Sequence, residues 1–415
     1  MHDRYSRRSF LTGVLACGTL SASAAYFLPG GRGATPAPRN IELKLVTGAD
    51  STGARHRLIE KWNHENPSKI VKEHPAVIGG TGDERATMLS RAREREADIL
   101  VLDVIHIPEF AARGLITPVL LKGSDEFLEP TLRAGQARDE PGLFWAVPFN
   151  TDVGMLFTRN ADDDQEIPTL AQVLSDRVED GSHEFVGQLS SISATASEAF
   201  VVNVLEHALS VDDHILDDDG HPAYSLHAWQ NALEQLRRAI SRGRVTVGAD
   251  EDDSRELFKK RRLRYMRNWP VKYRELQAAQ DPDPDIEHIR VDRLPIGILG
   301  GSSLAVVASS PHPQQAFEFI QFATDLPQQK DLAVGGLAPV RRATYTDPEL
   351  ASKIPYLGDL RNAVATARPR AVNPNYLSFS KVIHDRIGAL LRPGSRDLPG
   401  AFVDEMRAAL SSTTI

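Results

Sequence analysis

The hydrophobic positions of this chain follow two alternating periodicities from residue 41 onward. Residues 41–46 alternate apolar and polar side chains, which is typical of a half-buried strand. A helical pattern follows, with Leu58, Ile59 and Trp62 on one face. Residues 97–102 form a nearly continuous apolar run, as expected for a strand buried on both faces of a parallel sheet. The pattern therefore predicts an α/β layer structure.

The alternation of strands and helices continues along the chain, and after Pro148 the pattern becomes mainly helical. The chain returns to a buried strand near residue 300, so we predict that a sheet domain is interrupted by a more helical one. The remaining predicted elements are a strand around 70–77, a turn at 79–82, helices at 83–96, 197–209 and 226–241, a strand at 300–309 and a helix at 313–324.

The first 33 residues carry an export pattern. Residues 6–12 read Ser-Arg-Arg-Ser-Phe-Leu-Thr, a twin-arginine signature, and a mildly apolar stretch continues to Leu28. Polar and small residues interrupt this stretch, whereas a transmembrane helix needs about 20 mainly apolar residues. We predict that residues 1–33 are a signal segment and linker, and that the protein is exported to the outer face of the membrane, to the periplasm or to the medium.

Two processing sites compete within that segment. Residues 14–17, Val-Leu-Ala-Cys, resemble a lipobox, which would place a lipid anchor on Cys17, whereas residues 22–24, Ala-Ser-Ala, suit an ordinary signal peptidase. Cys17 is the only cysteine of the chain, so a lone thiol in an exported protein needs an explanation. The sequence leaves both outcomes open: acylation of Cys17, or its removal with the signal.

The composition of the chain after residue 33 limits the classes of protein to which it can belong. With 41% hydrophobic and 25% charged residues, the part after residue 33 has the composition of a soluble protein, and its length favours two domains. No cysteine remains there, so its stability must come from core burial rather than disulfides. The net charge of -8 argues against nucleic acid or anionic lipid headgroups as partners.

A series of motifs in fixed order resembles the extracellular solute-binding proteins of ABC importers, in the branch of the maltose- and oligosaccharide-binding proteins. An aspartate-ended strand at 98–103 is followed by a helix end at 108–118, Pro-Glu-Phe-Ala-Ala-Arg-Gly-Leu-Ile-Thr-Pro. The other motifs are Gly-Leu-Phe-Trp-Ala-Val-Pro at 142–148, Asn-Thr-Asp-Val-Gly at 150–154, Asn-Trp-Pro at 268–270, Leu-Pro at 294–295, Gly-Gly-Ser-Ser-Leu-Ala-Val at 300–306, Ala-Pro-Val-Arg at 338–341 and Ala-Arg-Pro-Arg at 367–370, with Tyr376 beyond.

The resemblance implies a two-lobe periplasmic-binding-protein-like fold of type II, in which each lobe is a mixed sheet flanked by helices and a ligand binds in the cleft between them. Lobe 1 would comprise residues 41–149 and 300–341, and lobe 2 residues 150–299 and 342–412. The lobes would close on a ligand by a hinge motion and present it to a membrane permease. The protein would act as a monomer and would need no cofactor.

Site residues follow from the same resemblance, combined with the rule that ligands lie beyond the carboxyl ends of strands in open α/β sheets. On lobe 1 these are Asp50, Ser51, Glu84 and Asp103. On lobe 2 and the crossing between lobes they are Asn150, Asp152, Trp269, Gly300, Gly301, Ser302 and Arg370. A sugar has vicinal hydroxyls and an apolar ring face, so carboxylates, amides and a guanidinium would bind hydroxyls and Trp269 would stack on a ring.

Several alternatives stay open at this point. Trp269 can be a core residue, Asp103 can cap the helix after its strand, and Asp152 can belong to a turn. Asp103 is followed by Val104, Ile105 and His106 rather than by further aromatic residues, and aromatic content is only 7%. The ligand is therefore a saccharide by first expectation, with a polyol phosphate or a non-sugar solute as alternatives.

Enzyme and metal signatures are absent from the sequence. There is no His-Glu-x-x-His, no Gly-x-Ser-x-Gly and no cysteine nucleophile after residue 33, and the histidines form no metal-ligand pattern. We therefore expect a binding protein without a metal site. A sensor built on the same scaffold, or an exported enzyme acting on a polysaccharide, are the remaining hypotheses.

Overall fold

The computed structural model describes residues 40–76, 81–137, 140–161, 166–175, 185–191, 198–223, 225–277, 282–392, 394–395 and 397–411. The chain divides into two units, residues 1–40 and residues 41–415. The predicted signal segment, with Cys17, lies outside the described residues, as does the start of the predicted turn at 79–82. No helix in the described ranges is both long enough and apolar enough to cross a bilayer.

The first sheet of the larger unit has the strand order β2-β1-β3-β13-β4, and β7 also pairs with β13. β1 is parallel to β2 and β3, whereas β13 is antiparallel to β3, β4 and β7. The bounds are β1 Ile41–Thr47, β2 Lys69–Pro75, β3 Ile99–Asp103, β4 Ile116–Thr117, β7 Val147–Val153 and β13 Leu299–Val307. This mixed sheet confirms the predicted strands near 41, 70, 97 and 300, with ends shifted by up to two residues.

Alternate residues of β3 explain its continuous apolar run. Ile99 and Val101 pack in a core with α2 (Ala54–Glu65), α11 (Pro313–Ala323) and α12 (Leu326–Val334). Leu100 and Leu102 pack in another with α3 (Thr81–Arg93) and α4 (Ile107–Ala112). Both faces of the strand are therefore covered by helices, as the pattern predicted.

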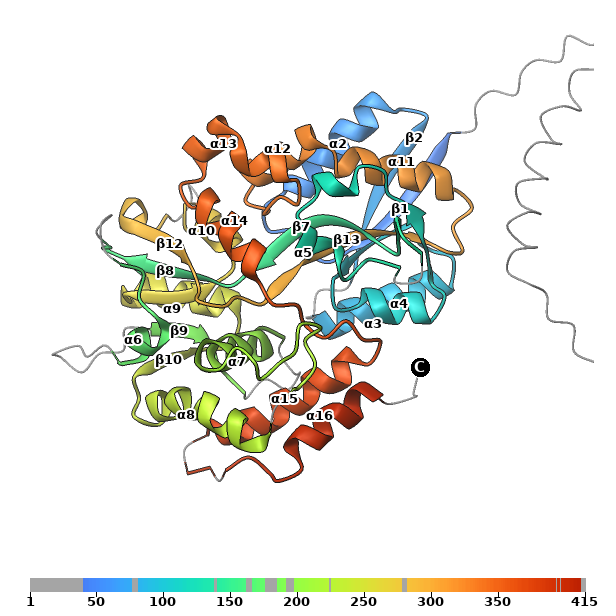
Figure 1. Ribbon diagram of the computed structural model, residues 1–415. Helices are drawn as coiled ribbons and strands as arrows, with labels where there is room; N and C mark the ends of the chain where they lie inside the picture. Colours follow the sequence, from blue (N-terminus) through green and yellow to red (C-terminus); the bar gives the residue numbers. More distant parts are fainter. Residues whose placement is uncertain are drawn as a thin grey trace, which may run out of the picture. The chain divides into compact units, whose positions relative to one another are not determined.

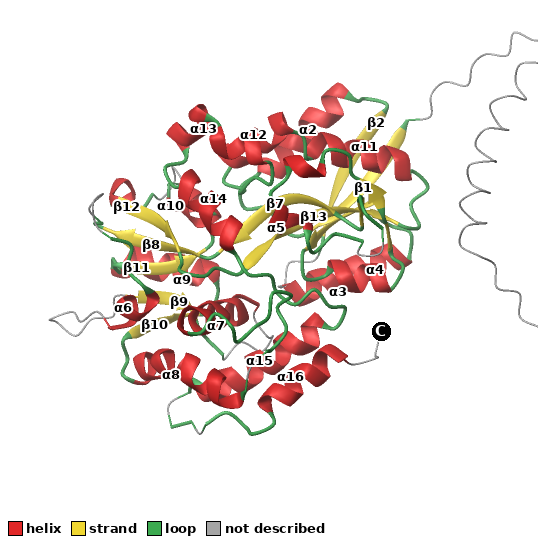
Figure 2. Ribbon diagram, in the orientation of Figure 1, coloured by secondary structure: helices red, strands yellow, loops and turns green. Residues whose placement is uncertain are grey.

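The second sheet has the order β10-β9-β11-β8-β12 and is also covered on both faces (Figures 1 and 2). Its strands are β8 Met155–Arg159, β9 Phe185–Gln188, β10 Val245–Gly248, β11 Tyr265–Asn268 and β12 Ile289–Arg293. One core joins the sheet to α7 (Glu198–Val211), α8 (Leu226–Ser241), α15 (Tyr376–Leu390) and α16 (Phe402–Ser411). The other joins it to α9 (Glu251–Arg261), α10 (Val271–Leu276), α13 (Pro348–Lys353) and α14 (Leu357–Thr366).

The remaining elements are short connections between these layers. They are β5 (Val119–Leu120), which pairs with β6 (Leu143–Phe144), α5 (Glu129–Leu132), α6 (Leu170–Ser175) and the 3₁₀ turns η2 (Ser124–Glu126), η3 (Ile286–His288) and η4 (Arg342–Thr346). The predicted helices at 197–209, 226–241 and 313–324 correspond to α7, α8 and α11. The mixed α/β fold with two helix-flanked sheets is confirmed.

The chain passes between the two sheets where β7 continues through Gly154 into β8, and again where β12 leads through residues 294–298 into β13. Gly154 is required at the first crossing, because a Cβ there would lie 2.2 Å from Oε1 of Glu206 and 2.7 Å from Nη2 of Arg267. Near the second crossing, Ile298 forms a parallel bridge with Arg368 and donates its N–H to Glu206 over 3.1 Å. The buried ion pair of Arg267 with Glu206 therefore lies beside both connections.

Candidate functional site

Asp50 organises the loop after β1. Its carboxylate accepts hydrogen bonds from the N–H of Thr52 (2.9 Å), the hydroxyl of Thr52 (2.6 Å) and the N–H of Arg55 (2.9 Å). Burial acts to raise the pKa of Asp50, but these hydrogen bonds outweigh it and hold the pKa below its usual value. Asp50 thus fixes the start of α2, with its acceptors directed at its own loop.

Ser51, in the same loop, contacts α10, the helix that follows β11 of the second sheet. Its hydroxyl donates to Oε1 of Glu275 on α10 over 2.9 Å. Glu275 also accepts from Lys272 (2.9 and 3.1 Å), which binds Asp252 as well. Ser51 therefore links residues that the sequence assigned to opposite lobes.

Asp103 ends β3 and combines the two roles that the sequence left open. Its Oδ1 accepts the N–H of Ile105 over 3.1 Å, which fixes the turn before α4. The same oxygen accepts from Nη2 of Arg370 over 2.9 Å. Asp103 is therefore both a turn residue and the partner of a predicted site residue 267 positions away.

Arg370 lies between two carboxylates, Asp103 and Glu198, and its side chain is only 4% exposed. Its Nη1 donates to Oε1 of Glu198 over 3.1 Å, and Glu198 in turn accepts from the hydroxyls of Tyr376 and Ser380. Burial would lower the pKa of Arg370, but its two carboxylate partners raise it, so the guanidinium stays charged. Its Nε has no hydrogen-bond partner among the described residues.

Asn150, Asp152 and Gly300–Ser302 lie side by side where β13 runs between β3 and β7. Ser302 is paired with Asp103 on one side and with Asn150 on the other, and Gly300 is paired with Asp152. Gly301 has φ +116° and a Cβ there would lie 2.4 Å from the carbonyl of Asn150, so only glycine fits.

Asp152 is a half-buried carboxylate, and few hydrogen bonds or positive charges offset the cost of its burial. Burial raises its pKa to about 7, and the nearby charges of Glu251 and Asp103 add to the rise, while Arg267 opposes it. Its Oδ1 accepts the N–H of Val153 over 3.2 Å. Asp152 is thus an acceptor that is costly to leave charged without a partner.

Trp269 follows β11 and is half-buried. Its indole N–H donates to Oε1 of Glu251 over 3.0 Å, and the guanidinium of Arg267 lies 4.1 Å from the ring centroid. Arg267 is itself held by two hydrogen bonds to Glu206, of 2.6 and 2.9 Å. The ring orientation is therefore fixed by a cation–π contact on one side and a hydrogen bond at its edge.

Glu84, on α3, lines a cavity of about 210 Å³ together with Asp103, Ser302 and residues after β1. A second, larger hollow of about 750 Å³ lies between α2, α10 and α12 and includes Ser51 and Glu275. The structure thus places Asp103, Ser302 and Glu84 around one cavity. Asp103 also pairs with Arg370, whereas Ser51 lines the larger hollow.

Sequence reasoning missed Glu198, Arg267, Glu206 and Glu251. Each makes its contact through the tertiary fold, and only Arg267 had a local signal, since it lies in the basic strand that precedes the predicted Trp269. Tyr376, which follows the motif at 367–370, is buried and donates its hydroxyl hydrogen to Glu198.

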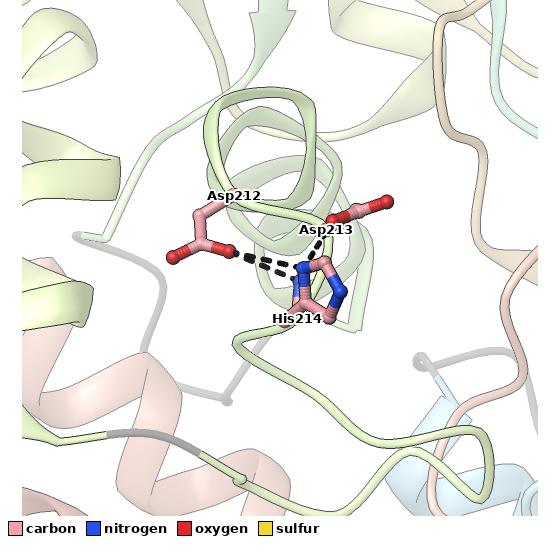
Figure 3. Close-up of side chains that lie close together, drawn as sticks. All are labelled: Asp212, Asp213 and His214. Atoms are coloured by element: carbon pink, nitrogen blue, oxygen red, sulfur yellow. Dashed lines mark hydrogen bonds and ion pairs between the residues drawn. The ribbon is translucent and has the colours of Figure 1, made fainter.

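One group of potential metal ligands exists among the described residues, at the turn after α7 (Figure 3). It comprises Asp212, Asp213 and His214, whose Nδ1 lies 2.5 Å from Asp213 and 3.7 Å from Asp212. The three are consecutive and half-exposed or exposed, and Asp212 also accepts the N–H of His214 as an ordinary turn residue does. The trio is a solvated turn and is distant in sequence from every predicted site residue.

Comparison with known proteins gives the class that this fold and site define. A family model described as bacterial extracellular solute-binding protein matches residues 75–355, more than half of the chain. A probable ABC transporter-binding protein of Deinococcus radiodurans is 26% identical over 339 residues, covering 73% of this chain and 78% of that protein.

Solved structures with the same fold include maltose-bound MalE3 of T. maritima, with a TM-score of 0.76, 23% identity and coverage of 89% of this chain and 99% of that one. The GacH receptor of Streptomyces glaucescens has a TM-score of 0.75, 17% identity and coverage of 89% and 98%. At these identities the likeness concerns the fold. The chain belongs to the bacterial extracellular solute-binding protein family, and it is a solute-binding protein.

Proposed function

We propose that this chain captures a saccharide or polyol outside the cell and delivers it to the permease of an ABC importer. The observation that carries the proposal is the convergence of Asp103, Arg370 and Glu198, with Asp152 next to them in the sheet. Carboxylates and a guanidinium held rigidly by each other form a pre-organised set of acceptors and donors, which vicinal hydroxyls match.

Trp269 supplies the apolar part of such a site. Because its ring is braced by Arg267 and its N–H is bound to Glu251, it can receive the ring face of a sugar without losing side-chain entropy on binding. The relatives support this ligand class, since the printed names of the solved structures with this fold include maltose, α-D-tagatose and ribitol.

Lobe closure is the mechanism that we propose. The contacts that join residues of opposite predicted lobes include the hydrogen bond of Ser51 with Glu275 and the ion pair of Asp103 with Arg370. A ligand that binds only when these contacts form shifts the population toward the closed state by its differential affinity. The importer can then distinguish loaded from empty protein.

Export and anchoring complete the proposal. We propose that the twin-arginine segment directs export and that the protein works as a monomer. The signal is removed either by cleavage before Cys17, which then carries a lipid anchor, or by cleavage after Ala24, which leaves a chain without an anchor. The intact mass of the protein isolated from membrane and soluble fractions distinguishes the two forms.

The experiment is a thermal-shift screen of residues 34–415 against mono- and oligosaccharides, polyols, sugar phosphates and amino acids. A ligand present at 100 times its Kd should stabilise the protein by about 2.7 kcal/mol. Trp269→Ala should weaken binding about tenfold, as expected for loss of an aromatic stack together with its buried area. Trp269→Phe is the matched control, because it keeps a smaller aromatic ring for stacking and removes the indole N–H that binds Glu251. If no sugar or polyol stabilises the protein, the proposed ligand class is wrong.

A further inference from the structure

The 210 Å³ cavity lies beyond the carboxyl ends of β1 and β3, beside α3. Its wall includes Gly48, Glu84, Arg85, Asp103, His106 and Ser302. The volume corresponds to about seven water molecules at ~30 Å³ each. It is smaller than the roughly 300–1,000 Å³ of pockets that enclose a whole drug-sized ligand. The cavity therefore suits a small group or a single sugar unit of a ligand.

The two arginines in the wall are already neutralised. Arg55 donates to Glu73 over 2.7 Å and to the carbonyl of Gly48 over 2.7 Å. Arg85 makes two hydrogen bonds to Glu109, of 2.6 and 2.5 Å. Both guanidinium groups are thus bound to carboxylates, so the cavity offers little net positive charge to an anionic ligand.

Glu84 contributes a partly compensated carboxylate to the same wall. It forms no ion pair with any described residue. Burial raises the pKa of Glu84, a backbone hydrogen bond from Ala49 and the charge of Arg55 oppose the rise, and the charge of Asp103 adds to it. A carboxylate in this position favours a hydroxyl or an ammonium group and repels a phosphate.

His106 is a second and independent sign of a ligand. Its side chain lines the cavity, the residue is only 4% exposed, and neither ring nitrogen has a hydrogen-bond partner among the described residues. Burial lowers the pKa of His106, so the imidazole is neutral, with one nitrogen accepting and the other donating. Buried polar atoms are rarely left without partners, so a polar group bound in the cavity would satisfy atoms that the described residues leave unpartnered.

We propose that this cavity is a subsite that recognises a neutral hydroxyl or an ammonium group of the solute through His106 and Glu84, and that it excludes phosphate esters. This inference rests on the proposed function and narrows its substrate class. It assigns His106, which the sequence left as a departure from the aromatic pattern of the family, as a residue that determines specificity.

The experiment compares neutral probes with their phosphate esters by isothermal titration calorimetry on residues 34–415. The pairs are ribitol with ribitol 5-phosphate, D-tagatose with D-tagatose 6-phosphate, and maltose with maltose 6′-phosphate. The variants are His106→Phe and Glu84→Gln. His384→Gln is the matched control, because His384 is also buried with an unpartnered Nε2 but lies on α15 against Phe200.

We expect at least one neutral probe to bind, and its phosphate ester to bind at least about tenfold more weakly. His106→Phe and Glu84→Gln should each reduce the affinity for the neutral probe by about tenfold or more, as expected for loss of a hydrogen bond that involves a buried or charged group. Glu84→Gln should also reduce the difference in affinity between the neutral probe and its ester. His384→Gln should bind both as the wild type does. Circular dichroism verifies folding, and His106→Asn replaces His106→Phe if the latter does not fold.

Two results would overturn the subsite. The first is an ester that binds as tightly as its parent, and the second is a neutral probe whose affinity is unchanged in both variants; in either case solute binding itself stands. If neither these probes nor the wider saccharide and polyol screen yields a ligand, the proposed function fails and the subsite fails with it.

Discussion

Two buried arginines of this protein, Arg159 and Arg370, are each held by two carboxylates, yet their surroundings differ. Arg159 donates to Asp283 (2.7 and 2.8 Å) and to Asp285 (2.7 Å), and its remaining donors reach the carbonyls of Leu263 and Phe258. The side chains of Arg159 and Asp283 are 3% and 0% exposed. All donor groups are used, and solvent is excluded.

Arg370 is equally buried but incompletely satisfied. Its carboxylate partners Asp103 and Glu198 are 28% and 13% exposed, and its Nε has no described partner. Asp103 also lines the 210 Å³ cavity. An ion pair that is saturated on every side stabilises a fold, whereas one with open acceptors and an open donor is available to a ligand. From this comparison we propose that Arg159 is a structural arginine and that Arg370 is a ligand-binding one.

The largest expected effect is on the stability of the Arg159 cluster. Arg159→Met leaves Asp283 buried without its partner, so the free energy of unfolding should fall by about 3–5 kcal/mol. Chemical denaturation measures the change. Arg238→Met is the control, because Arg238 is exposed and pairs with Glu234 on the surface of α8, where a loss under about 1 kcal/mol is expected. Equal losses in the two variants would contradict the assignment of Arg159 as a structural residue.

Arg370→Met should act mainly on binding. We expect the affinity for the sugar found in the screen to fall about 10- to 100-fold, since a charged donor to the ligand and the alignment of Asp103 and Glu198 are lost. Calorimetry measures this, and Arg368→Met is the control because Arg368 pairs with Asp218 instead. Undiminished affinity, together with a stability loss as large as that of Arg159→Met, would make Arg370 a second structural arginine.

The smallest effect concerns pH and Asp152. Because burial raises its pKa from 3.8 to about 7, the folded protein binds more protons than the unfolded chain between these values. The contribution of Asp152 to stability therefore decreases as the pH rises from about 4 to about 7. Asp152→Asn should be more stable than the wild type at pH 8, on the order of 1 kcal/mol after discounting for partial solvent exposure.

The gain from Asp152→Asn should become small near pH 4, where the carboxyl group is protonated in the folded state and about half protonated in the unfolded chain. Thermal unfolding between pH 4 and 8 tests the trend, with Asp125→Asn as an exposed control. A difference that does not change with pH would show that the carboxylate of Asp152 is not strained by burial. The same titration in the presence of ligand would show whether the solute relieves that strain.

Sequence reasoning located the scaffold well, because the periodicity of a strand or helix depends on neighbouring residues. The alternation in β1, the continuous run in β3 and the helical spacing in α7 and α8 each appear in the fold with ends shifted by only a few residues. The resemblance to a known family added residues that periodicity does not reach, such as Arg370, whose closeness to Asp103 then emerged in the structure. The lobe boundaries and the binding roles of the predicted site residues remain predictions.

The sequence by itself determined the class of fold and the succession of strands and helices, whereas the export role of residues 1–33 stays a prediction. Only the tertiary structure decided which charges neutralise one another: Arg55 and Arg85 are bound to Glu73 and Glu109. Glu84 has no ion-pair partner among the described residues, and neither ring nitrogen of His106 has a hydrogen-bond partner among them. The physical reason is that local propensity acts over a few residues, whereas ion pairing and burial depend on which distant elements the sheets place side by side.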